Sequence, residues 1–227
     1  MLFIVPTPIG NLRDITLRAL DTLKSTDMIL CEDTRHTQKL LSVYEIKKPL
    51  MSFHEHSAPG KVKEIIRILE EGKNLALVSD GGMPLISDPG FQIVHQAILQ
   101  KIPFEVLPGA SALTTALAAS GLATDSFSFF GFLPQKAAAR KKFLLSLTEK
   151  EETLIFYESP YRLVQTLEEM AEIFGQREAA VARELTKKFE EIQRGTLADL
   201  VVKFSSKKVL GEIVVLVSGK NRKVLFS

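Results

Sequence analysis

The sequence SDGGMPLISDPG, residues 79–90, follows directly on the apolar run 75–78. Gly81 and Gly82 carry no side chain, so backbone there can approach a ligand closely, and the prolines in the loop restrict its path. A loop of this composition at the carboxyl end of a buried strand is typical of a ligand site in an open α/β sheet. Taken alone, the same motif also fits a capped turn that leads into a helix near Phe91.

Two further loops have the same character. PTPIGNL, residues 6–12, ends the apolar run 2–5, and LPGASA, residues 107–112, ends an apolar run near 104–107. Loops that follow the strands of a parallel sheet gather at one edge of that sheet. We therefore expect the three loops to form one pocket.

The first half of the chain alternates short apolar runs with helical periodicity. The pattern predicts strands at 2–5, 28–31, 50–53, 75–78 and 104–107, and helices at 15–24, 37–43, 61–71, 91–100 and 112–119. This βα rhythm predicts a mostly parallel sheet with helices on both faces.

The rhythm changes around residues 121–124, where a long aromatic strand, 126–133, begins. We place a domain boundary there, which gives an N-terminal α/β domain, 1–119, with the three loops, and a C-terminal α/β domain, 120–227. The second domain is predicted to contain helices at 136–147, 161–174 and 197–204, and strands at 153–157, 178–182, 190–194 and 211–217. Several of these strands have hairpin-length separations, so a mixed sheet is expected.

Composition indicates the class of protein but says little about its binding partners. The 227 residues are 45% hydrophobic and 25% charged, with a net charge of +2, as in an ordinary globular protein. Cys31 is the only cysteine, so no intrachain disulfide can form. No apolar run approaches a membrane span, and no signal peptide is recognisable, so we expect a cytoplasmic protein without a membrane partner.

Several common signatures are missing. The chain has neither a G-x-x-x-x-G-K-[ST] phosphate loop nor a G-x-G-x-x-G motif, which argues against a nucleoside triphosphatase or a dinucleotide oxidoreductase. His54-Glu55-His56 is the one local metal-like pattern, and its spacing alone does not close a metal site. We expect no metal.

Seven motifs in order carry a resemblance to a known family. They are PTPIGNL, CEDTRHT, SFHEH, SDGGMPLISDPG, LPGASAL, FYESPYR and ARELTKKFEEIQRGTL, and together they resemble the ribosomal-RNA branch of the tetrapyrrole methylase family. The resemblance implies a two-domain class III S-adenosylmethionine-dependent methyltransferase, with the methyl donor in the cleft between the domains. It also implies a homodimer that methylates the ribose 2′-hydroxyl of a decoding-site cytidine in 16S ribosomal RNA of the small ribosomal subunit.

The resemblance also implies which residues contact S-adenosylmethionine. These are Ile9, Met83, Ile86, Ser111, Ala112, Tyr157, Ala182 and Ile213. Backbone groups and apolar side chains of this kind suit a zwitterionic head and an adenine. For Ile86, Ala182 and Ile213, plain core packing is an equally good interpretation. The family usually has threonine at Met83 and alanine at Gly81.

Charged residues at strand ends are the candidates for handling the acceptor. Asp33 or Glu184 is expected to assist deprotonation, and Arg35 or Arg183 to orient the nucleotide, with Asn11 and Glu32 nearby. Asp33 also fits a helix amino terminus, and Arg183-Glu184 also fits a structural ion pair. Tyr161 replaces a usual histidine and keeps a ring for base stacking.

Lysine and arginine clusters form a candidate phosphate footprint, although each alone also fits a solvated surface. They are Lys136 with Arg140-Lys141-Lys142, Lys187-Lys188, Lys207-Lys208, and Lys220 with Arg222-Lys223.

Two alternatives stay open at this point. One is methylation of a tetrapyrrole precursor, of a modified protein residue or of another small acceptor, because one fold serves many substrates. The other is a catalytically weak RNA-binding homologue, in which Gly81 and Met83 have altered the loop.

Overall fold

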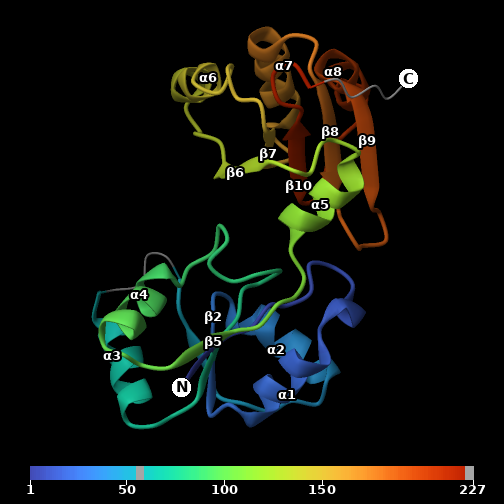
Figure 1. Cartoon of the computed structure of the whole chain (residues 1–227). Coiled ribbons are helices and arrows are strands. Elements are labelled where there is room, and N and C mark those ends of the chain that lie inside the picture. Colours follow the sequence, from blue (N-terminus) through green and yellow to red (C-terminus); the bar gives the residue numbers. More distant parts are fainter. Residues whose placement is uncertain (55–58, 223–227) are drawn as a thin grey trace. The chain divides into compact units, whose positions relative to one another are not determined.

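The computed structural model describes residues 1–54 and 59–222, and its contacts divide the chain into two compact units, Met1–Ser111 and Ala112–Ser227 (Figure 1). Glu55 and His56 of the metal-like pattern, and Lys223 of the last basic cluster, lie outside the described residues. Each unit contains one sheet of five strands.

The first unit is built on a parallel sheet, as predicted. Its strands are β1 (Leu2–Ile4), β2 (Met28–Cys31), β3 (Leu50–Ser52), β4 (Leu75–Leu77) and β5 (Phe104–Val106), in the order β3-β2-β4-β1-β5. All four neighbouring pairs are parallel. Since β1 lies between β4 and β5, the loops that follow these three strands are neighbours.

Helices cover both faces of this sheet. They are α1 (Leu17–Ser25), α2 (Thr34–Val43), α3 (Pro59–Glu70) and α4 (Phe91–Leu99), with a short 3-10 helix η1 (Leu12–Asp14) before α1. Residues of α3 and α4 pack against one face, on Leu2, Ile4 and Leu77, and residues of α1 and α2 pack against the other, on Val5 and Ala76. This two-sided burial explains the continuous apolar runs of the strands.

The second unit has the expected mixed sheet. Its elements are α5 (Ala112–Ser120), β6 (Phe127–Phe132), α6 (Ala137–Leu145), β7 (Thr153–Glu158), α7 (Leu163–Phe174), β8 (Glu178–Arg183), β9 (Glu191–Thr196), α8 (Leu197–Ser205) and β10 (Ile213–Val217). The strand order is β6-β7-β10-β8-β9, in which only β6 and β7 pair in parallel.

Helix α5 belongs to the second unit, whereas the predicted boundary between 119 and 120 assigned it to the first. It packs against β8, β9 and β10, and it buries Ala116 and Leu117. The Arg194 guanidinium of β9 also donates hydrogen bonds to the Ala119 and Ser120 carbonyls. These contacts are distant in sequence, so the change of rhythm near residue 121 did not reveal them.

Candidate functional site

The loops after β1 and β4 are bonded to each other. Thr7 and Gly82 exchange two backbone hydrogen bonds, of 3.0 and 2.9 Å. The Thr7 hydroxyl donates to the Ser79 carbonyl at 2.9 Å, and the Ser79 hydroxyl donates to the Gly82 carbonyl at 3.0 Å. Thr7 and Ser79 are buried, so this network fixes the two loops as one structure.

The loop after β5 packs against the same structure. A Cβ atom on Gly109 would lie 2.7 Å from the Cβ of Pro6, and a Cβ on Gly82 would lie 3.3 Å from the Cγ2 of Ile9 and 3.7 Å from the Ala110 carbonyl oxygen. Gly82 also has a φ of 101°, a conformation that side chains disfavour. The three loops therefore meet within the first unit, as predicted. That they form one ligand pocket stays a prediction.

The loop after β4 is also strained. Leu85 and Ser87 have φ values of 72° and 65°, although neither is glycine. Gly90 has a φ of 136°, and a Cβ there would lie 2.6 Å from the Cδ2 of Leu77. Strain of this kind persists where the surrounding structure enforces it, and it concentrates at ligand sites.

All four donor residues predicted in the first unit, Ile9, Met83, Ile86 and Ser111, lie on these loops. Ile9 is buried beside Gly82, Met83 is half-buried, and Ile86 is 39% exposed and donates its amide to the Met83 carbonyl. Ser111 ends the first unit. Met83 and Ile86 thus offer accessible apolar surface next to the glycine backbone.

Sheet register places the predicted donor residues of the second unit on two different faces. Tyr157 and Ala182 both pair with Val214, so they share one face of the sheet. Ile213 lies one position along β10, on the opposite face, in the core formed with the helices. The Ile213 side chain therefore packs in the core, and a ligand on the face of Tyr157 and Ala182 could contact only the backbone of Ile213. Ala112 begins helix α5.

Asp33 caps helix α2. Its carboxylate accepts hydrogen bonds from the amides of Arg35 and His36, at 2.8 and 3.4 Å, and its side chain also pairs with the Arg35 guanidinium at 3.1 Å. The hydrogen bonds from Arg35 lower the pKa of Asp33 to about 2. Asp33 is therefore an ionised hydrogen-bond acceptor throughout the neutral range, already aligned with the cation beside it.

Arg183 and Glu184 are each engaged within the second unit. Arg183 pairs with Glu191 at 3.2 Å and donates to the Leu210 carbonyl at 3.0 Å. Burial raises the pKa of Glu184, but hydrogen bonds from Lys187 and from the Glu212 amide outweigh it, so this pKa lies below its usual range. These contacts fit the structural ion-pair interpretation.

The sequence interpretation missed Asp88, at the end of the strained loop. Burial, then the charge of Glu32, raises the pKa of Asp88 to about 6, although a hydrogen bond with Ser79 opposes the shift. Asp80 adds further negative charge, and its carboxylate accepts a hydrogen bond from the Asp33 amide at 3.3 Å. A carboxyl with this pKa is suited to exchanging protons near neutral pH. Only the convergence of the loops after β2 and β4 creates this environment.

Asp88→Asn is expected to stabilise the protein above pH 6. Because the pKa of Asp88 is higher in the folded state than in the unfolded state, folding favours the protonated carboxyl. The free energy of unfolding of the wild type therefore falls as the pH rises from the unfolded-state pKa of Asp88 through about 6. We expect the free energy of unfolding of Asp88→Asn to exceed that of the wild type by about 1–2 kcal/mol at pH 8, after allowance for partial exposure, and to equal it at pH 4. Urea unfolding at pH 8 and at pH 4 measures this difference. Asp125→Asn is the control, because Arg222 lowers the pKa of Asp125 and no gain should follow.

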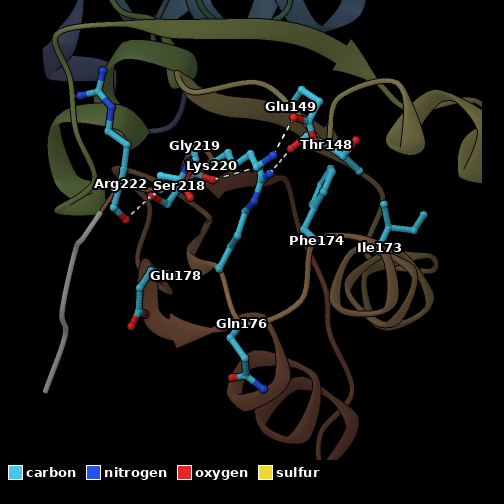
Figure 2. A pocket seen from close by; sticks show the side chains of 12 residues that line it. Thr148, Glu149, Ile173, Phe174, Gln176, Glu178, Ser218, Gly219, Lys220 and Arg222 are labelled. Carbon is cyan, nitrogen blue, oxygen red and sulfur yellow. Dashed lines mark hydrogen bonds and ion pairs between the residues drawn. The ribbon is translucent and has the colours of Figure 1, made fainter.

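A cavity of about 540 Å³ lies in the second unit, at the end of the sheet where β8 begins and β10 ends (Figure 2). Arg177 is one of its lining residues, with its guanidinium 4.9 Å from the centroid of the Phe174 ring and bonded to the Thr148 carbonyl. Tyr157, Ala182 and Ile213 do not line it. This cavity is thus separate from the predicted donor residues.

No helix among residues 1–54 and 59–222 is both long and apolar enough to span a membrane.

Comparison with solved structures shows the same fold in enzymes of low sequence identity. The methyltransferase CobJ aligns over 99% of this chain and 96% of its own, with a TM-score of 0.71 and 18% identity. A uroporphyrin-III-C-methyltransferase from Thermus thermophilus aligns over 95% and 93%, with a TM-score of 0.67 and 22% identity.

Sequence comparison finds much nearer relatives. Ribosomal RNA small subunit methyltransferase I of Bacillus subtilis is 51% identical over 221 residues, which cover 97% of this chain and 76% of the relative. The protein of the same name from Thermotoga maritima is 50% identical over 219 residues, which cover 96% of this chain and 98% of the relative. The model of the Tetrapyrrole (Corrin/Porphyrin) Methylases matches residues 1–201. The chain therefore belongs to the tetrapyrrole methylase family.

Proposed function

We propose that this protein transfers a methyl group from S-adenosylmethionine to the ribose 2′-hydroxyl of a cytidine at the decoding site of 16S ribosomal RNA. The observation that carries the proposal is the near-complete match to relatives named for small-subunit ribosomal RNA methylation, at about half identity. Cytoplasmic localisation and a homodimer, the latter testable by sedimentation, remain predictions.

The loops of the first unit fit the donor. When bound, S-adenosylmethionine supplies an electrophilic methyl carbon. At Gly82 and Gly109 a side chain would collide with a neighbouring loop, so these glycines allow the three loops to pack closely into one structure on which the donor can bind. Met83 and Ile86 provide apolar surface for an adenine. Such a reaction mainly requires alignment and exclusion of water, which rigid loops can provide.

The acceptor side is assigned to charged residues at strand ends. Asp33 is proposed to accept a hydrogen bond from the ribose hydroxyl, and Arg35 to bind a phosphate or ribose oxygen. Arg183 and Glu184 are proposed as positioning residues, because their side chains hold the segments around Leu210 and Glu212.

Asp33→Asn tests this assignment. Asparagine caps a helix as well as aspartate does, so the fold should persist, while loss of the charge should lower kcat about 100-fold. Methyl transfer to small ribosomal subunits measures kcat, and calorimetry with S-adenosylmethionine should give an unchanged Kd. Asp27→Asn is a matched control, because Asp27 also accepts a backbone amide hydrogen bond, at 2.8 Å from Asn74, and lies near a cation, Lys73. A wild-type kcat in Asp33→Asn would remove Asp33 from catalysis.

A further inference from the structure

The sheet of the second unit gathers several loops at one end. Glu158, Ile213, Arg183 and Glu191 lie side by side across β7, β10, β8 and β9 at this end. Phe132, the last residue of β6, pairs with Tyr157 beside them. The loops after β6, β7 and β8 therefore all leave the sheet at the end opposite to the cavity.

A large exposed ring lies on, or directly before, each of these three loops. Phe132 is 60% exposed, Tyr161 is 90% exposed and Phe189 is 65% exposed. A single exposed apolar side chain is ordinary, but three exposed aromatic rings at the same end of one sheet form a pattern. In the strand order, β8, whose following loop carries Phe189, lies three strand spacings from β6, or roughly 14 Å, which suits an extended ligand better than a small one.

The backbone that carries Phe132 and Tyr161 is held by arginines. Arg162 pairs with the buried Glu158 at 2.8 Å and donates to the Leu133 carbonyl at 3.4 Å, which joins the two loops next to the rings. The buried Arg140 donates to the Pro134 and Gln135 carbonyls, at 3.3 and 3.1 Å. The rings are thus displayed on fixed loops, which lowers the entropy cost of binding.

The third loop is similarly ordered. Its residues Glu184 and Thr186 have φ values of 51° and 63°, and the Thr186 amide donates to the Glu190 carboxylate at 2.5 Å. The Lys188 ammonium lies 5.5 Å from the centroid of the Phe189 ring. A ring and a cation are therefore presented together on a turn with a defined conformation.

Charge at this end favours an anionic partner. The carboxylates of Glu158, Glu184, Glu190, Glu191 and Glu212 all accept hydrogen bonds within the unit. Within the described part of the chain, no carboxylate lies within 4.0 Å of the ammonium groups of Lys136 or Lys188. Cations interleaved with exposed rings are the usual surface for single-stranded nucleic acid.

We propose that Phe132, Tyr161 and Phe189 stack on unpaired bases of the RNA substrate, with Lys136 and Lys188 contacting its phosphates. This rests on the proposed function, because it specifies how the same RNA is held. It assigns RNA binding to the second unit and requires single-stranded character along several nucleotides of the substrate.

The test uses the full-length protein and two variants, Tyr161→Ala and Phe189→Ala, which remove rings without a burial role. Fluorescence anisotropy with a labelled single-stranded oligoribonucleotide should show a Kd about 5–100 times higher for each variant. Tyr161→Trp should retain binding. Phe91→Ala is the matched control, since Phe91 is 71% exposed but lies on α4 of the first unit, and it should bind like wild type.

Four further measurements separate the possible failures. Duplex RNA of the same sequence should bind all variants equally, and the Kd for S-adenosylmethionine should be constant. Wild-type RNA affinity in both alanine variants, while the wild type methylates RNA, would overturn base stacking and leave the proposed function intact. A changed sedimentation coefficient with unchanged RNA affinity would instead identify this surface as an interface between copies. Absence of RNA methylation by the wild type would count against the proposed function itself.

Discussion

Replacing Glu169 with alanine is expected to lower the free energy of unfolding by about 3–5 kcal/mol. Glu169 holds Arg140 through two hydrogen bonds, of 2.7 and 2.8 Å, and the Arg140 side chain is only 1% exposed. Without Glu169, a buried guanidinium would lose its counter-ion and stay largely desolvated. This cost is much larger than the value of a surface ion pair.

Glu172→Ala is the matched control for this experiment. Glu172 also lies on α7 and pairs with a cation of α6, Lys141, at 2.7 Å, but its side chain is 65% exposed. We expect a loss of at most about 1 kcal/mol there. Urea unfolding measures both variants. Equal losses of unfolding free energy in Glu169→Ala and Glu172→Ala would show that burial of the Arg140–Glu169 pair does not increase its contribution to stability.

Gly109→Ala is expected to weaken S-adenosylmethionine binding about 10–100-fold. The new Cβ would lie 2.7 and 2.9 Å from the Cβ and Cγ of Pro6, so the loop after β5 must move away from the loop after β1. The proline ring cannot rotate aside, and such overpacking costs about 1–3 kcal/mol. Because the donor is proposed to bind on these loops, a displacement of either one should reduce affinity.

Gly60→Ala serves as its control, because a Cβ there has no neighbouring atom within 4 Å. Calorimetric titration with S-adenosylmethionine measures the Kd of both variants. If Gly109→Ala binds the donor as tightly as wild type and Gly60→Ala, the loop after β5 does not belong to the donor site.

The sequence was sufficient for the secondary structure and for the convergence of the loops in the first unit. Strands and helices differ in hydrophobic period, and parallel strands bring their loops to one edge, so local patterns predict both. For α2 the hydrophobic period predicted a start at 37, three residues too late. The alternative interpretation of Asp33 as a helix amino terminus is confirmed, because α2 begins at Thr34 and the Asp33 side chain caps it.

Features that depend on long-range packing were not predictable in this way. Arg140 reads as part of a basic surface run, yet it is buried against Glu169, so it cannot contribute to a phosphate footprint. Ile213 lies in the helix-covered core because the register of β10 sets its face. Asp88 acquires its pKa from groups on another loop, which no local pattern reports.

The most direct test of the proposed activity is transfer of a labelled methyl group from S-adenosylmethionine to small ribosomal subunits that lack this modification, followed by mapping of ribose methylation. Naked 16S ribosomal RNA and a porphyrinogen are assayed in parallel. The proposal predicts label on the ribose of one decoding-site cytidine and none on the porphyrinogen. Measurable donor binding without label in any RNA would contradict it, and label on the porphyrinogen alone would show that the acceptor is a tetrapyrrole.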